Sequence, residues 1–147
     1  MKLSRRTTTA SALAVLALGG TLAATTPATA TTTAAGAYNG ACGEGYRVTA
    51  STPIKSSPTK VIGTTYITWS TGAQRLCAVT IRNNPGAKVF MEVTLDTFPD
   101  STTPATDSGY FSTYAGPVYK DKPAAGECLT WSGTIGINYN GDTSICD

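Results

Sequence analysis

Alternation of apolar and polar residues with a period of two is the feature of this sequence that most restricts its fold. The clearest examples are the segments from Leu76 to Arg82 and from Lys88 to Asp96. A period of two is typical of β-strands that bury one face. Beyond the first thirty residues no segment has the i, i+3, i+4, i+7 spacing of a helix, so we expect an all-β chain. The residues expected in its core are Val79, Ile81, Val89, Met91, Val93, Leu95, Leu129 and Trp131.

Turn residues divide the rest of the chain into about seven short strands. The expected strands are 46–50, 61–70, 76–82, 88–96, 109–114, 128–135 and 137–140. The strands over 61–70, 76–82 and 88–96 are expected to form a meander, in which each strand pairs with the next. Residues 51–60 and 98–107 are expected to be polar loops, and Ala115-Gly116-Pro117 is expected to end the fifth strand. This pattern predicts an antiparallel β-sandwich or small barrel of about seven strands, stapled by two disulfides.

The N-terminus has the three regions of a secretory signal peptide. Basic residues at positions 2, 5 and 6 precede an apolar run over 10–24, and Ala28-Thr29-Ala30 has the small residues of a cleavage site. The apolar run is short for a membrane span, which needs about 20 apolar residues. We therefore expect a signal peptide over 1–30, with cleavage as late as residue 37 as an alternative. A disordered leader over 31–37 and a single β domain over 38–147 would follow it.

Removal of the signal peptide changes the charge balance of the chain. Three of the eleven basic residues lie in it, so eight remain against nine acidic residues. A near-neutral chain lacks the electrostatic footprint of a nucleic-acid-binding protein. No later apolar stretch is long enough to cross a membrane. We expect neither nucleic acid nor a membrane span for the mature form.

Four cysteines, Cys42, Cys77, Cys128 and Cys146, predict two disulfides in an exported chain. A reversal near Gly136 would place Cys128 close to Cys146, within the roughly 3.5–4.5 Å between Cβ atoms that a bridge requires. Cys77 alternates in phase with Val79, so we expect it to be buried and bridged to Cys42. The alternative is the nested pairing of Cys42 with Cys146 and Cys77 with Cys128.

The sequence has no histidine, which excludes Ser-His-Asp and Cys-His catalysis and leaves no zinc motif. Serine–lysine catalysis would need a buried lysine, but we expect the lysines to lie in loops or at strand ends. Those lysines are Lys55, Lys60, Lys88, Lys120 and Lys122. Asp96, Asp100 and Asp107 are candidates for a glycosidase pair or a calcium site, but solvated turn acids are the simpler interpretation. We expect no catalytic residue, metal or cofactor.

Aromatic residues provide the candidate binding surface. Phe90 lies on the polar face of its expected strand, with Glu92 and Thr94. Tyr110 and Tyr114 are expected to share one face of the next strand, opposite Phe111. Exposed aromatic side chains at Phe90, Tyr110 and Tyr114 would suit a glycan or a partner surface, and the alternative is that packing or a loop covers them.

Three stretches of the mature domain resemble the spore-associated protein A family of Streptomyces and related actinobacteria. They are Tyr38-Asn39-Gly40-Ala41-Cys42-Gly43-Glu44-Gly45-Tyr46, Asp107 to Tyr119, which contains Thr113-Tyr114-Ala115-Gly116-Pro117, and Cys128 to Ile135 with the near-terminal Cys146. The resemblance covers about residues 38–147. It implies export and a role at the spore or cell envelope, and it brings no catalytic residues.

These observations favour a secreted, non-enzymatic protein that is associated with the spore or aerial-hypha surface and has a structural or adhesive role. The expected partner is a component of the cell envelope or spore surface. The alternative is a small secreted binding module or enzyme inhibitor that recognises a glycan or protein. A small hydrolase is a third hypothesis.

Overall fold

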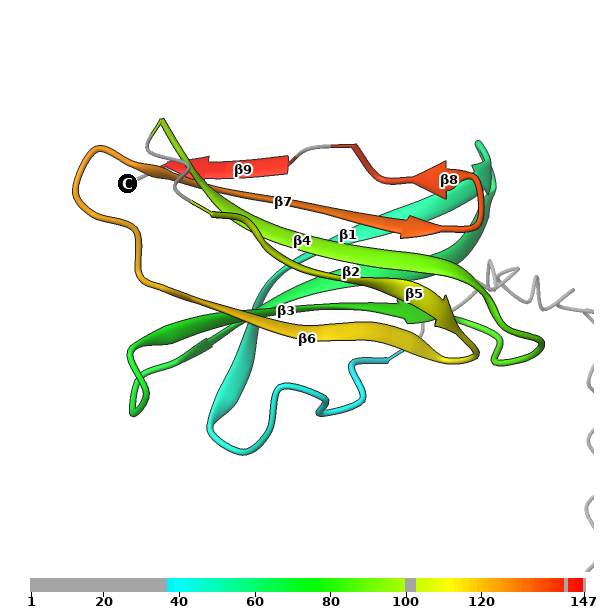
Figure 1. The fold of residues 1–147 in the computed structure, drawn as a ribbon, viewed down its shortest axis with the longest axis horizontal. Coiled ribbons are helices and arrows are strands. Elements are labelled where there is room, and N and C mark those ends of the chain that lie inside the picture. Colours follow the sequence, from blue (N-terminus) through cyan, green and yellow to red (C-terminus); the bar gives the residue numbers. More distant parts are fainter. Residues whose placement is uncertain (1–36, 100–102, 142, 147) are drawn as a thin grey trace, which may run out of the picture. The chain divides into compact units, whose positions relative to one another are not determined.

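The computed structural model describes residues 37–99, 103–141 and 143–146, in which nine strands form two antiparallel sheets packed face to face (Figure 1). The first sheet has the order β1 (Tyr46–Ser57), β2 (Lys60–Ser70), β3 (Arg75–Arg82) and β6 (Tyr114–Asp121). The second has the order β5 (Ala105–Phe111), β4 (Val89–Phe98), β7 (Cys128–Ile135) and β8 (Asn138–Tyr139), and β9 (Thr143–Cys146) also pairs with β7. The predicted sandwich is confirmed, and the barrel alternative is wrong because neither sheet closes.

The expected signal peptide over 1–30 and the leader that follows it lie outside the described residues, apart from Ala37. In the described part of the chain, no helix has the length and apolar character to cross a membrane.

The predicted loop over 51–60 is wrong, because β1 continues to Ser57 and pairs with β2 along almost its whole length. Ile54 is fully buried in the core, and the Thr52 hydroxyl accepts a hydrogen bond of 3.1 Å from the Trp131 indole of the second sheet. Pro53 is tolerated because β1 is an edge strand, where a missing N–H breaks no ladder on the open side. One buried side chain among polar neighbours was too weak a pattern to reveal this strand.

The predicted meander is also wrong in its last step. β3 pairs with β2 and β6, whereas β4 pairs with β5 and β7 in the other sheet. The connection over 83–88 therefore crosses between the sheets instead of forming a hairpin. Alternation identifies a strand and its buried face, but it does not identify the neighbouring strand.

Ala115-Gly116-Pro117 does not end a strand, because all three residues lie inside β6. The pairing with β3 shifts register between Ala78 and Thr80, which is typical of a β-bulge. The break comes earlier, at residues 112–113 between β5 and β6.

The first sheet is buried on both faces. Its inner face joins the second sheet in the main core, whose buried members are Ile54, Ile67, Leu76, Ala78, Met91, Val93, Leu95, Ala115, Val118, Leu129, Trp131 and Ile135. Its outer face carries a second cluster of Cys42, Tyr66, Cys77, Val79 and Ile81. Burial of the predicted core residues is confirmed, except that Val89 is only half-buried. Cys77, Val79 and Ile81 of β3 therefore pack under the N-terminal segment and not between the two sheets.

The disulfides join Cys42 to Cys77 and Cys128 to Cys146, which is the expected pairing, so the nested alternative is wrong. Cys42–Cys77 fastens the segment before β1 onto the outer face of the first sheet. Cys128 and Cys146 lie opposite each other in the ladder between β7 and β9.

Gly133 occupies a point at the centre of the sandwich where no larger residue fits. A Cβ at this position would overlap the hydroxyls of Thr65 and Thr80, which are buried and lie 3.0 Å apart in a hydrogen bond. Gly133→Ala should therefore lower the free energy of unfolding by about 2–4 kcal/mol, through overpacking and loss of that hydrogen bond. Urea unfolding followed by circular dichroism measures the change. In the matched control Gly72→Ala, the new Cβ meets nothing within 4 Å, so equal losses in the two variants would contradict this packing.

Candidate surface-binding site

The outer face of the second sheet presents exposed aromatic side chains. Phe90 on β4 lies directly opposite Tyr110 on β5, and their ring centroids are 6.1 Å apart in an edge-to-face arrangement. Tyr139 on β8 lies opposite Thr134 of β7, which in turn lies opposite Glu92 on the same face of β4 as Phe90. The exposed fractions are 37% for Phe90, 70% for Tyr110 and 66% for Tyr139. We call Phe90, Tyr110 and Tyr139 the aromatic face.

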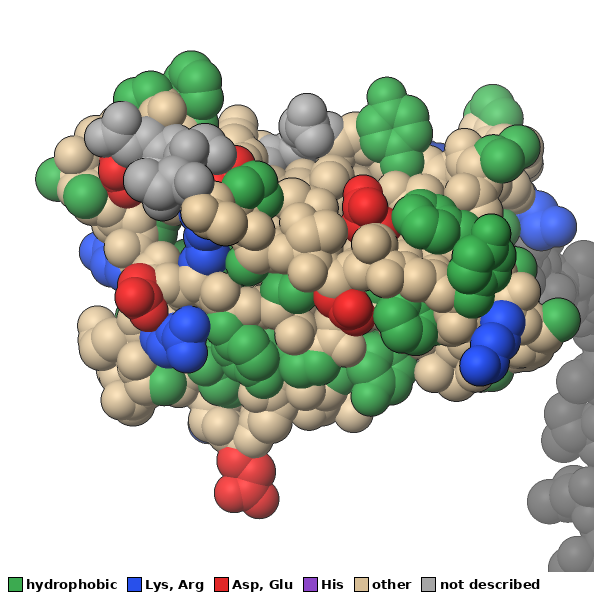
Figure 2. All heavy atoms as spheres, in the orientation of Figure 1, with side chains coloured by type: hydrophobic (Ala, Val, Ile, Leu, Met, Phe, Trp, Pro, Cys, Tyr) green, Lys and Arg blue, Asp and Glu red, His purple; other side chains and the backbone are tan. Residues whose placement is uncertain are grey.

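Tyr139 was missed by sequence reasoning because β8 has only two residues, which is too short for alternation to be visible. Its position depends on the turn at Gly136, where φ is +63°. The Gly136 amide donates a hydrogen bond of 2.8 Å to the carbonyl of Phe90, which holds this turn against β4. Ile137, in the same turn, is 97% exposed. Figure 2 shows hydrophobic side chains gathered over this end of the second sheet.

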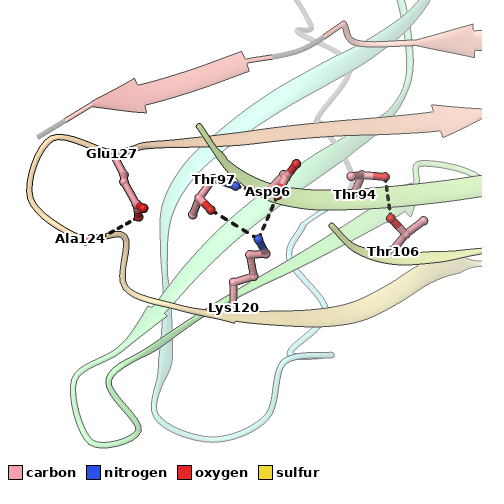
Figure 3. Close-up of polar contacts among 7 residues, drawn as sticks. All are labelled: Thr94, Asp96, Thr97, Thr106, Lys120, Ala124 and Glu127. Atoms are coloured by element: carbon pink, nitrogen blue, oxygen red, sulfur yellow. Dashed lines mark hydrogen bonds and ion pairs between the residues drawn. The ribbon is translucent and has the colours of Figure 1, made fainter. Parts of the chain in front are cut away.

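Hydroxyl groups continue the same surface along the strands. The outward-facing residues on β5, β4 and β7 include Thr106, Ser108, Thr94, Ser132 and Thr134. The hydroxyls of Thr94 and Thr106 lie 3.2 Å apart, within hydrogen-bond distance (Figure 3). Aromatic rings beside hydroxyl groups offer apolar contact area together with hydrogen-bonding groups, which suits an uncharged polymer such as a glycan.

Charge on this face is low. Among the outward-facing described residues of β4, β5 and β7, the charged ones are Glu92 and Asp96. Asp96 is paired with Lys120 of β6, whose Nζ lies 2.9 Å from its carboxylate, and the Thr97 amide donates to the same oxygen at 2.8 Å (Figure 3). This ion pair joins the two sheets, because Asp96 lies on β4 of the second sheet and Lys120 lies on β6 of the first. Both side chains are largely buried. Lys120 lies near the end of β6, where such a lysine is expected, but its charge is paired and largely buried.

Tyr114 does not belong to the aromatic face, so the prediction that Tyr110 and Tyr114 share one face is wrong. Tyr110 is the second-to-last residue of β5, whereas Tyr114 is the first residue of β6, which belongs to the other sheet. Tyr114 lies opposite Ile81, whose side chain belongs to the outer cluster of the first sheet. The two tyrosines therefore face opposite sides of the sandwich. Tyr114 is 36% exposed.

The outer face of the first sheet is occupied by a tyrosine cluster. The Tyr119 hydroxyl donates to the Cys42 carbonyl at 3.2 Å, its ring meets Tyr46 edge-on at 5.7 Å, and the Arg75 guanidinium lies 5.6 Å from the ring centroid. Burial raises the pKa of the Tyr119 phenol, Tyr46 and Tyr38 raise it further, and Arg75 opposes the shift. The phenol therefore stays protonated at neutral pH, and its hydrogen bond helps hold the N-terminal segment in place.

The candidate acidic residues make separate contacts. The Asp107 carboxylate accepts a hydrogen bond of 2.6 Å from the amide of Gly116, while Asp96 pairs with Lys120. Asp100 lies outside the described residues. Over the part of the chain that the structure describes, no group of three or more His, Cys, Asp and Glu side chains could hold a metal ion.

Comparison with known proteins supplies one informative match. The chain is 41% identical over 125 residues to the spore-associated protein A of Streptomyces coelicolor, and the match covers 84% of this chain and 76% of that protein. No protein-family model matches the chain. No solved structure matches it significantly.

Proposed function

Because the chain belongs to the spore-associated protein A family, we propose that it is a secreted, non-enzymatic protein that adheres to the surface of spores or aerial hyphae. The aromatic face is the observation that carries the adhesive part of this proposal. Three aromatic side chains on one side of a sheet are exposed, two of them in edge-to-face contact, and hydroxyl-bearing strands lie beside them. Exposed apolar groups gathered in this way mark interaction surfaces more often than isolated ones do.

Export is supported by two independent features of the chain. The first thirty residues have the pattern of a signal peptide. All four cysteines are paired in disulfides, which persist in oxidising compartments and are rare in the cytosol.

The surface chemistry favours an uncharged partner in the cell envelope or spore coat. Two charged residues face outward among the described positions of β4, β5 and β7, namely Glu92 and Asp96. Asp96 is paired with Lys120, so Glu92 provides the one charge on this face without an ion pair among the described residues. A highly charged polymer would gain little on such a face, whereas the faces of sugar rings can stack on Phe90, Tyr110 and Tyr139. A small secreted binding module or enzyme inhibitor that recognises a glycan or protein is the alternative function for the same surface.

Adhesion should depend on the aromatic face. In the purified mature protein, Tyr110→Ser with Tyr139→Ser should reduce retention on spores about tenfold, since each aromatic contact contributes about 0.5–1.5 kcal/mol. Co-sedimentation of the protein with washed spores measures retention. Both side chains are exposed, so the unfolding midpoint should stay within a few degrees of the parent.

The matched control for this experiment is Tyr114→Ser, an exposed tyrosine on the other side of the sandwich. It should leave retention unchanged. Equal loss in the control, or no retention of the parent protein, would overturn the proposed surface. Parallel pull-downs on chitin, starch and peptidoglycan separate the alternatives, because strong binding to chitin or starch without spore retention would favour the binding module.

A further inference from the structure

The two sheets leave a cavity at the end of the sandwich away from β8. It lies where β2 turns into β3 and where the loop over 122–127 carries the chain from β6 to β7, at the left of Figure 1. Its volume is about 380 Å³. The first sheet contributes Trp69 and Leu76, and the second contributes Leu129 and Ile145.

The floor of this cavity is the protein core itself. Ile67, Leu76 and Leu129 line the cavity and are also buried members of the main core. Trp69 packs against that core and remains partly exposed. A molecule that entered the cavity would therefore lie against apolar side chains of both sheets and exchange water for them, which is the main source of affinity at such sites.

Local hydrogen bonds order the loop and the turn that border this cavity. In the loop over 122–127, the Glu127 amide donates to the Ala124 carbonyl at 3.0 Å, and the Ala124 amide donates to the Glu127 carboxylate at 2.9 Å (Figure 3). On the other side, the Gln74 side chain donates to the Thr71 carbonyl at 2.7 Å across the β2–β3 turn. The wall at Ile145 belongs to β9, which the Cys128–Cys146 disulfide fastens to β7. A preformed cavity spares a ligand the cost of ordering the protein.

Size, shape and charge define the class of molecule that fits. An enclosed cavity of about 150 Å³ accommodates benzene, so this partly open space of about 380 Å³ is large enough for a molecule of more than one ring. The Trp69 ring lines the cavity and offers a flat stacking surface, which favours a flat aromatic molecule. The mouth has one basic and one acidic residue, Lys122 and Glu127, which together favour neither sign of charge.

We propose that this cavity binds an uncharged, planar aromatic molecule of two or three fused rings. The cavity and the aromatic face share no residue, so ligand binding and adhesion are separable activities of one protein. Such a ligand would be carried by the protein without being altered.

Isothermal titration of the folded mature protein with 2-naphthol tests this proposal, with 1-decanol and naphthalene-2-sulfonate as comparison ligands. We expect saturable 1:1 binding of 2-naphthol, at least fivefold tighter than binding of either comparison ligand. Trp69→Leu should weaken it about tenfold by removing the stacking surface. Ile145→Ser should weaken it severalfold and, being an exposed position, should leave the fold intact.

The matched control is Ile137→Ser, since Ile137 is another exposed isoleucine and does not line this cavity. It should bind 2-naphthol like the parent. Absence of saturable 2-naphthol binding would overturn the proposal. Tighter binding of the flexible alcohol, or unchanged affinity in Ile145→Ser, would overturn it equally. Tyr110→Ser should keep full 2-naphthol affinity, so failure of one proposal leaves the other intact.

Discussion

Val93→Asp should give no folded protein. Val93 is fully buried in the middle of β4, and its side chain packs close to Gly116 of the other sheet. A carboxylate at this position would have no partner and would cost several kcal/mol, against a typical total stability of about 5–15 kcal/mol. Asp107, directly opposite on β5, already accepts a hydrogen bond from Gly116, so the new charge would also face a carboxylate. Expression, circular dichroism and limited proteolysis together measure the outcome.

Thr94→Asp is the matched control for this experiment, because Thr94 is the next residue on β4 and faces outward. It should fold, with the small loss expected from breaking its contact with the Thr106 hydroxyl. A soluble, protease-resistant Val93→Asp protein would show that the two faces of β4 are reversed.

Removal of the Cys42–Cys77 disulfide should be the second most damaging change. The two cysteines are 35 residues apart, so the chain-entropy model assigns the bridge about 4 kcal/mol. The bridge also holds the segment that covers Tyr66 and Val79, so its removal should loosen the outer cluster of the first sheet. The double variant Cys42→Ala with Cys77→Ala avoids a free thiol, and urea unfolding measures its stability.

The other disulfide is the internal comparison. Cys128 and Cys146 are 18 residues apart, which corresponds to about 3 kcal/mol, and their bridge fastens the four-residue strand β9. Cys128→Ala with Cys146→Ala should therefore cost less than removal of the first bridge. The reverse order would contradict the structural role assigned to the N-terminal segment.

The strands of this protein were largely predictable from sequence, but their neighbours were not. Alternation located β3, β4 and β7 to within about two residues, and the β-branched and aromatic residues of β2 located that strand equally well, since each of these strands contacts a core. It did not show that the alternating apolar residues of β3 lie on the outside of its sheet, because only the three-dimensional path of the N-terminal segment buries them there. Likewise, no local signal marks residues 83–88 as a crossing between sheets.

The candidate site was predicted only in part, because the sequence pattern of a single strand shows which side chains face outward but not where neighbouring strands begin. The exposure of Phe90 follows from its place among polar residues on β4. Tyr110 and Tyr114 were assigned to one strand because the turn between them, Ser112-Thr113, contains neither glycine nor proline. The cavity beside Trp69 could not be predicted at all, because it depends on how a turn, a loop and β9 meet at one end of the sandwich.

Mass spectrometry of surface washes from spores tests directly whether the exported protein resides on the spore surface. Cultures of the source organism would be carried through sporulation, and the washes compared with the culture medium and with the cell interior. We expect the protein to be enriched in the spore washes and its first detected residue to lie between 31 and 38, after removal of the signal peptide. Recovery from the medium alone, or of a chain that keeps its first thirty residues inside the cell, would contradict this expectation.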